Sequence, residues 1–216
     1  MGSMEPICEL QNISKSYADH VVLNNISLAI AEGEMVAITG KSGSGKTTVL
    51  NIMGMLEKPD DGVVKLFGEE LPRIGSIKAK QLLRTRLVHL FQNYALIDNA
   101  TVDENLDIPL LYSKKTKSAK QLLKTEALEK VGLSLSLKRK IHELSGGEQQ
   151  RVAIARILLK PCDLILADEP TGSLDTANRD EIMSILKELH HSGKTIIIVT
   201  HDPDVAKACN RIIELS

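Results

Sequence analysis

The chain has 216 residues, of which 43% are hydrophobic and 25% are charged, with a formal net charge of −1. This length and composition predict one globular domain with a real core and exclude wholesale disorder. The near-neutral charge and an aromatic content of 2% give no support to a nucleic-acid-binding role. No apolar run reaches the length of a membrane span, and no signal peptide opens the chain.

The two ends of the chain and its cysteines add little chemistry. Met1, Gly2 and Ser3 before Met4 resemble a cloning remnant, so we assign the domain to residues 4–216. The three cysteines, at positions 8, 162 and 209, have no metal-ligand spacing, which predicts reduced thiols. The chain stops soon after its last predicted strand, so we expect no carboxy-terminal regulatory domain.

The amino-terminal part of the chain predicts a small antiparallel sheet. Residues 7–17, 21–30 and 62–67 are short strand-like segments separated by turn residues. Between them, residues 34–39 form a short apolar strand that ends at a glycine-rich loop, and residues 47–56 have a helical pattern. We expect the small sheet to flank the main core.

Two further buried strands are predicted in the carboxy-terminal half, at residues 163–167 and 195–199. Continuous apolar runs of this kind suit strands that are covered on both faces. Their alternation with helical segments predicts an α/β fold with a parallel central sheet. The segment at about 93–159 contains no convincing strand, so we interpret it as an inserted α-helical subdomain.

The basic stretch from Lys114 to Lys120 lies within this helical segment. A solvated loop and helix start is the favoured interpretation, and a lipid-facing patch is the alternative.

The first glycine-rich loop follows the predicted strand at 34–39. It consists of Gly40, Lys41, Ser42, Gly43, Ser44, Gly45, Lys46 and Thr47, followed by Thr48, and fits the pattern G-x-x-x-x-G-K-[ST]. Its backbone N–H groups can approach phosphate oxygens, with Lys46 reaching the β- and γ-phosphates and the Thr47 hydroxyl ligating Mg²⁺. The helix start behind the loop favours negative charge. This loop predicts nucleotide binding and, together with the parallel central sheet, a P-loop NTPase core.

Acidic residues close the strand at 163–167. Asp168 at the strand's carboxyl end is the expected Mg²⁺ partner, and Glu169 could polarise the attacking water. An acidic pair at a helix start is the alternative, which the glycine loop makes less favoured.

Three more residues lie next to strand-like segments and are candidates for the same site. His201 follows the strand at 195–199, where we favour a γ-phosphate contact over a structural role. Gln92 follows an apolar run and could complete the Mg²⁺ shell or hold the water, although glutamine is also common on surfaces. Tyr17 could stack on an adenine or be a half-buried strand aromatic, and the sequence leaves both open.

A second phosphate-sized loop occurs at residues 144–151, LSGGEQQR, where a serine and two glycines precede an apolar-periodic run. One nucleotide hardly needs two phosphate-binding loops from the same chain. The second loop therefore predicts a site that is shared between chains.

Taken together, these residues resemble the ATP-binding cassette (ABC) ATPase family over essentially the whole chain. The matches, in the family's order, are Tyr17 (adenine stacking), residues 40–48 (Walker A), Gln92 (Q-loop), residues 144–149 (signature), residues 164–168 (Walker B), Glu169 (catalytic glutamate), residues 173–175 (D-loop) and His201 (switch histidine).

The resemblance implies an ATPase in which two cassettes close head to tail around two ATP molecules and Mg²⁺. Glu169, His201, Gln92 and Lys46 would be catalytic, and Thr47, Gln92 and Asp168 would hold the metal. Ser145, Gly146, Gly147, Glu148 and Asp175 would contact the ATP that is bound to the partner's P-loop. The active form would be a homodimer.

A finer resemblance, carried by residues 91–97 and 101–106, is to the lipoprotein-release, macrolide-export and bacteriocin-export group. It implies a cytoplasmic subunit on the inner face of the cell membrane that powers a separate permease, docked around Asn93 to Tyr112. The cargo is not encoded, beyond the group's peptide, drug or lipid-like substrates. The alternative is a mechanical or signalling ATPase of the same family, of the cell-division or antibiotic-sensing type. Repair, translation and small-molecule kinase proteins fit poorly.

Overall fold

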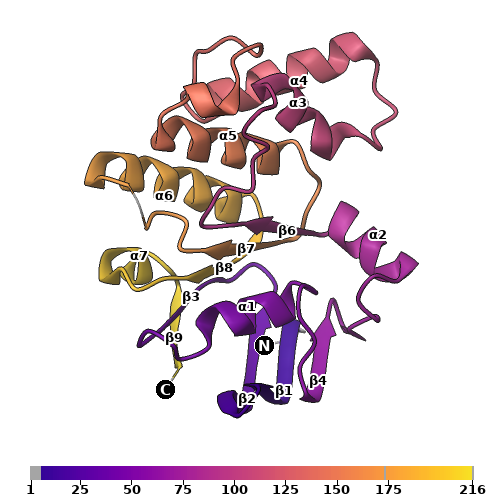
Figure 1. Cartoon of the computed structure of the whole chain (residues 1–216), viewed down its shortest axis with the longest axis vertical. Coiled ribbons are helices and arrows are strands. Elements are labelled where there is room, and N and C mark those ends of the chain that lie inside the picture. The colour runs from indigo at the N-terminus through magenta and orange to yellow at the C-terminus, as the bar shows by residue number, and fades with distance from the viewer. Residues whose placement is uncertain (1–5, 173, 216) are drawn as a thin grey trace.

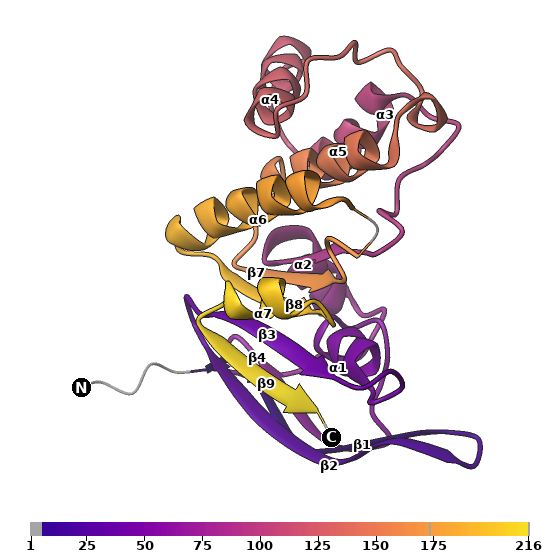
Figure 2. The ribbon, with the colours of Figure 1, turned by 90° about the vertical axis from the view of Figure 1, so that its left-hand side faces the viewer.

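The computed structural model describes residues 6–172 and 174–215. Outside this part lie residues 1–5, with the predicted cloning remnant, as well as Ser173 of the predicted D-loop and Ser216. The described chain is layered: an antiparallel sheet lies at one end, a parallel sheet in the middle and a group of helices at the other end (Figures 1 and 2).

The antiparallel sheet forms from the amino-terminal strands, as the sequence predicts. Its strands are β1 (Pro6–Tyr17), β2 (His20–Ala31), β4 (Asp61–Leu66) and β5 (Glu69–Glu70), in the order β2-β1-β4-β5. A two-residue hairpin joins β1 to β2, since Tyr17 pairs with His20. Ala18 in that turn has a positive φ of 50°, which the tight hairpin geometry requires.

The parallel sheet forms the centre of the chain. It comprises β3 (Met35–Gly40), β6 (Leu87–Leu90), β7 (Leu164–Asp168), β8 (Thr195–Val199) and β9 (Arg211–Leu215), in the order β6-β7-β8-β3-β9. All four pairings between neighbours are parallel. The predicted parallel core is confirmed, whereas the edge strand β9 is absent from the sequence-based prediction.

Four helices accompany the strands directly. They are α1 (Lys46–Met53), α2 (Ile77–Thr85), α6 (Thr176–His191) and α7 (Pro203–Lys207). Helix α1 ends three residues before the predicted boundary, because Gly54 occupies its C-cap and Met55 has a positive φ of 57°. Of these helices, α1 lies between the antiparallel sheet and the parallel sheet (Figure 2).

The helices at the far end of the molecule come from the middle of the chain. They are α3 (Val102–Asp107), α4 (Lys117–Lys130) and α5 (Gly146–Leu158), with 3₁₀ turns η1 (Ile108–Leu110) and η2 (Ile141–Glu143). In the described residues, no helix combines the length and the apolar character that crossing a membrane requires.

The core has two parts, one on each face of the parallel sheet. Along β8, Ile196 and Ile198 pack with helices α3 to α6, whereas Ile197 and Val199 pack with α1 and the antiparallel sheet. Successive side chains of a strand point to opposite faces, so each central strand contributes to both parts. All five residues of β8 are buried, which explains its uninterrupted apolar sequence.

Candidate functional site

The loop between β3 and α1 has a backbone that only glycine adopts easily. Gly40, Gly43 and Gly45 have φ values of +148°, +82° and +84°. A Cβ atom on Gly40 would lie 2.4 Å from the backbone oxygen of Leu215. The loop is thus held tightly against its own fold on one side, while a Cβ on Gly43 would meet no atom within 4 Å.

Lys46 and Ser44 give this loop its polar interior. The Nζ of Lys46 donates to the carbonyl oxygens of Gly40 at 2.9 Å and Lys41 at 2.8 Å, so the ammonium group stays within the loop. The Oγ of Ser44 is buried and has no hydrogen-bond partner in the described part of the chain. Backbone N–H groups, a fixed cation, an unpartnered hydroxyl and the start of α1 together fit a polyphosphate.

Two oxygen atoms that could bind a divalent cation lie at the end of this loop. The hydroxyl of Thr47, at the start of α1, donates to Oδ1 of Asp168 at 3.3 Å, where β7 ends. Burial raises the pKa of the Asp168 carboxyl, and the hydrogen bond from Thr47 opposes that shift. Among residues 6–172 and 174–215, no cluster of three or more His, Cys, Asp and Glu side chains could hold a metal. A hydroxyl and a carboxylate oxygen beside a polyphosphate site fit Mg²⁺ that is held jointly with phosphate oxygens.

Glu169 has an unusual backbone conformation at the end of β7. Its φ is +46°, which is rare for a residue with a side chain and is typical of functional sites. Its N–H donates to the carbonyl oxygen of Val199 at 2.9 Å, which fixes the residue between β7 and β8. The carboxylate oxygen Oε1 lies 2.7 Å from Nδ1 of His201, and Oε2 accepts from the hydroxyl of buried Thr200 at 3.3 Å.

The pairing of Glu169 with His201 brings together two residues that the sequence singled out separately. Thr200 is a contributor that the sequence analysis missed. Its place between a buried strand and His201 was the available signal.

Gln92 lies on the same edge of the parallel sheet. It follows β6, whose last residue, Leu90, pairs with Ala167 next to Asp168. Gln92 is exposed, and the loop after it is strained: Tyr94 and Ala95 have φ values of +61° and +46°.

Arg156 of α5 holds this strained loop. Its guanidinium donates to the carbonyl oxygen of Tyr94 at 2.9 Å and to that of Ala95 at 2.6 Å. The sequence analysis did not find this role, because the partners are about 60 residues apart.

Tyr17 lies at the end of β1, beside α1. Its hydroxyl donates to Oε1 of Glu57 at 2.5 Å, and its side chain is 46% exposed. The Glu57 carboxylate raises the pKa of Tyr17, while a hydrogen bond with the Thr48 side chain opposes it. Adenine stacking and the strand-aromatic alternative both remain predictions.

The second glycine loop forms the start of α5. Ser145 is the N-cap residue, and Gly146 and Gly147 are the first two helical residues. The Ser145 hydroxyl accepts from the N–H of Glu148 at 3.3 Å, while Oε2 of Glu148 accepts from the N–H and the hydroxyl of Ser145 at 2.8 and 2.9 Å. This reciprocal capping box leaves the N–H groups of the two glycines as the open donors of the helix end.

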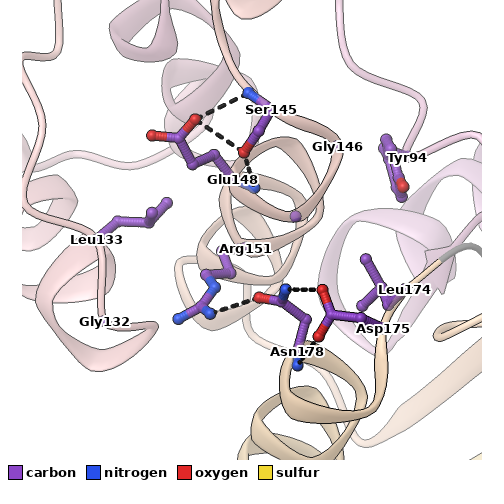
Figure 3. Close-up of a pocket in the computed structure, with 11 residues that line it drawn as sticks. Tyr94, Gly132, Leu133, Ser145, Gly146, Glu148, Arg151, Leu174, Asp175 and Asn178 are labelled. Carbon is purple, nitrogen blue, oxygen red and sulfur yellow. Dashed lines mark hydrogen bonds between the residues drawn. The ribbon is translucent and has the colours of Figure 1, made fainter.

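A cavity of about 680 Å³ opens in front of this loop (Figure 3). It is lined by Tyr94, Gly132, Leu133, Ser145, Gly146, Gly147, Glu148, Arg151, Leu174, Asp175 and Asn178. None of these residues belongs to the loop between β3 and α1. The cavity in front of the second glycine loop therefore does not include the first.

Asp175 lies across the cavity from Ser145, at the start of α6 (Figure 3). Its carboxylate accepts from the backbone N–H of Asn178 at 3.0 Å and from Nδ2 of Asn178 at 2.7 Å. Oδ1 of Asn178 in turn accepts from Arg151 of α5 at 2.8 Å. In this structure the carboxylates of Asp175 and Glu148 both cap helices, a role that the sequence analysis did not assign to them. Ser173 lies outside the described residues.

Comparison with known proteins gives concordant matches. The family model described as "ABC transporter" matches residues 23–172. The macrolide export ATP-binding/permease protein MacB of Shigella flexneri is 43% identical over 216 residues, which cover 98% of this chain and 33% of that protein. MacB 2 of Yersinia pestis is 42% identical over 213 residues, covering 97% of this chain and 31% of that protein. The chain thus spans about a third of the length of these relatives.

Solved structures match over nearly the full chain. The ATP-binding cassette MJ0796, in a dimeric post-hydrolysis state bound to ADP and Pi, has a TM-score of 0.89 and 38% identity, covering 97% of this chain and 94% of that one. The cbiO1 protein of Clostridium perfringens, part of the complex cbiONQ, has a TM-score of 0.85 and 28% identity, covering 98% of this chain and 85% of that one.

Proposed function

This chain belongs to the ABC transporter family, and from that premise we propose that it is the ATP-hydrolysing cassette of a membrane export complex. The observation that carries the proposal is the presence of two phosphate-sized glycine loops in one chain, with the cavity in front of the second not including the first. The family match and the solved cassette structures support the ATPase activity.

The loop between β3 and α1 is the proposed binding site for the phosphates of ATP. Lys46 would bind the β- and γ-phosphates, while the backbone N–H groups of residues 40–48 surround them. Thr47, Asp168 and Gln92 are the proposed Mg²⁺ ligands, in part through water. Bound there, Mg²⁺ would neutralise negative charge on the phosphates. Tyr17 is proposed to stack on the adenine.

Glu169 is the proposed general base. Its carboxylate would orient the attacking water and accept its proton. His201, hydrogen-bonded to Oε1 of Glu169, would hold that carboxylate and contact the γ-phosphate. The strained backbone of Glu169 supports this assignment, because such strain persists where surrounding structure enforces a functional geometry.

The start of α5 is proposed to act on a second subunit. In a head-to-tail homodimer, Ser145, Gly146 and Gly147, with Glu148 and Asp175 beside them, would face the ATP held by the partner's P-loop. The start of α5 carries a partial positive charge that favours an anion, and the γ-phosphate of the partner's ATP would supply that anion. The dimeric state of MJ0796, at 38% identity, supports this arrangement.

A groove of about 1060 Å³ is the proposed docking site for a permease. It is lined by α2, by residues 108–113 and by the end of α5, and it includes Phe91, Leu111 and Tyr112. Leu111 and Tyr112 are 66% and 68% exposed, so the groove presents apolar surface that a partner would cover. It coincides with the carboxy-terminal part of the segment 93–112. The groove supports the proposal that residues at about 93–159 form a helical subdomain facing the permease.

The MacB relatives carry ATP-binding and permease functions in one protein by name, which supports export as the coupled process. We propose a peptide, drug or lipid-like cargo and a location on the cytoplasmic face of the cell membrane, through the permease. A mechanical or signalling complex driven by the same ATP cycle is the second candidate. Identifying the membrane protein that co-purifies with the chain decides between them: a transporter permease supports export, and a cell-division or sensor protein supports the alternative.

The ATP cycle is tested with two variants. Glu169→Gln should bind ATP but hydrolyse it 10²- to 10⁴-fold more slowly, so that dimers accumulate in size-exclusion chromatography with ATP. Ser145→Arg in that background should retain ATP binding by the monomer and abolish the dimer. Normal turnover by Glu169→Gln would remove Glu169 from the role of base. Loss of monomer affinity in Ser145→Arg would contradict the role in the partner's site.

The docking site has its own test. Leu111→Asp should leave basal ATP hydrolysis unchanged and reduce its stimulation by the co-purified permease. The matched control is Leu122→Asp, at a residue that is 60% exposed on α4 and does not line the groove. Unchanged stimulation of Leu111→Asp would show that the assignment is wrong.

A further inference from the structure

The hydroxyl of Ser145 is already occupied in this structure. It donates to Oε2 of Glu148 at 2.9 Å, and the backbone N–H of Ser145 donates to the same oxygen at 2.8 Å (Figure 3). For the hydroxyl to donate to a γ-phosphate, this bond must break. The incoming phosphate would then lie beside a carboxylate that has just lost a donor.

Two negative groups meeting at one serine repel each other. The hydrogen bonds from Ser145, followed by the charge of Arg139, hold the pKa of Glu148 below its usual range, so the carboxylate is ionised at neutral pH. Like charges within a few ångströms disfavour each other unless a positive group lies nearby. The signature loop therefore needs a cation close to Glu148.

Arg139 provides that cation. Its Nη1 lies 3.5 Å from Oε1 of Glu148, which is the carboxylate oxygen that Ser145 does not use. Its Nη2 donates to the carbonyl oxygen of Glu143 at 2.7 Å, which anchors the guanidinium beside η2. The side chains of Arg139 and Glu148 are 38% and 33% exposed, so this ion pair lies at the protein surface.

The backbone of Arg139 is also fixed. Its carbonyl oxygen accepts from the N–H of Val102 at 2.9 Å, and an isolated β-bridge joins Lys140 to Thr101. The loop that carries Arg139 is thus attached to the start of α3. A closer approach of the guanidinium to Glu148 would therefore have to come from the side chain of Arg139 alone.

We infer that Arg139 is a positioning residue for the signature serine: when the partner's γ-phosphate arrives, Glu148 exchanges its bond to Ser145 for a full ion pair with Arg139. The exchange frees the Ser145 hydroxyl and neutralises the carboxylate that would repel the phosphate. This inference rests on the proposed function, because it presupposes that ATP lies between two subunits.

The test measures the dissociation constant of the ATP-bound dimer by analytical sedimentation. The Glu169→Gln background is used because its slow hydrolysis lets the dimer persist. Arg139→Gln keeps a donor for the Glu143 carbonyl and removes the charge. We expect about tenfold weaker dimerisation, since a partly exposed ion pair contributes a few-fold at each of two sites. Arg139→Lys should restore most of the loss. Lys138→Gln, which removes the same charge one position away, should have no effect.

A double variant separates charge from structure. In a Glu148→Gln background there is no carboxylate to neutralise, so Arg139→Gln should cause no further loss. An equal loss with and without the Glu148 charge, or no loss in Arg139→Gln alone, overturns the inference. ATP affinity of the monomer should be unchanged throughout. If the Glu169→Gln parent itself forms no dimer with ATP, the proposed function fails instead, and the inference with it.

Discussion

The two glycine loops of this chain need their glycines for different reasons. In the loop between β3 and α1, three glycines have positive φ values, and a side chain on Gly40 would strike the backbone of Leu215. At the start of α5, neither Gly146 nor Gly147 has a positive φ. A Cβ atom on Gly146 would lie 3.7 Å from the hydroxyl of Tyr94, which is an ordinary contact.

This difference separates the glycines that the fold of one chain requires from those that it does not. The fold of one chain accounts for the glycines of the first loop. The same fold does not require Gly146, which is compatible with the proposal that Gly146 faces the ATP of a partner subunit.

The largest effect is expected at Gly40. Gly40→Ala introduces a strained φ and a contact 2.4 Å from a backbone oxygen that cannot rotate away. We expect the free energy of unfolding to fall by about 2–4 kcal/mol and ATP binding by the monomer to be lost. Urea denaturation and a fluorescent-nucleotide titration measure the two effects. If Gly40→Ala is as stable as the wild type, the backbone conformation and packing of the first loop do not require glycine at this position.

A smaller and more selective effect is expected at Gly146. Gly146→Ala should change the free energy of unfolding by less than about 1 kcal/mol, because alanine suits the first turn of a helix. It should leave ATP binding by the monomer intact and weaken the ATP-dependent dimer at least about tenfold, since the added methyl group faces the partner. If Gly146→Ala destabilises the monomer as much as Gly40→Ala, the contrast between the loops disappears.

The smallest effect concerns the far end of α1, where Nε2 of the partly buried His89 lies 3.0 Å from the carbonyl oxygen of Gly54. Burial, and to a lesser degree the charge of Lys160, lowers the pKa of His89, while its bond to Gly54 opposes this. The unfolded chain therefore binds a proton more readily at this residue, and stability is lost as the pH falls below about 6.5.

His89→Gln should remove this contribution. The free energy of unfolding of the variant should fall less steeply between pH 7 and pH 5.5, by up to about 1.4 kcal/mol per pH unit. Denaturation curves at several pH values measure the slope. Identical slopes in the two proteins would show that the folded protein does not hold His89 neutral.

Much of the fold follows from the sequence because its signals are local. The buried strands β7 and β8 are uninterrupted apolar runs, and the first glycine loop is a contiguous pattern. Strand β9 was missed because its exposed Arg211 and Ile212 and its Glu214 break any clean pattern at the edge of the sheet. Helix α2 was missed because only one of its residues, Ala79, is buried.

The candidate site divides in the same way. The capping box of Ser145 and Glu148 has the spacing S-x-x-E, a local pattern that could have predicted it, although the sequence analysis did not assign it. The grip of Arg156 on the loop after Gln92 joins residues about 60 positions apart, and no local pattern encodes it. The roles of the individual site residues remain predictions that the variants above address.

Helix α5 has a consequence that reaches beyond one subunit. It carries Ser145 at its start and Arg156 near its end, where Arg156 holds the two residues that follow Asn93. Thirteen helical residues make a rod about 20 Å long. In the proposed dimer, that rod would have one end in the neighbour's ATP site and the other against its own glutamine loop. Helix α5 would then link the two ATP sites of the dimer, so that hydrolysis at one site would depend on the state of the other.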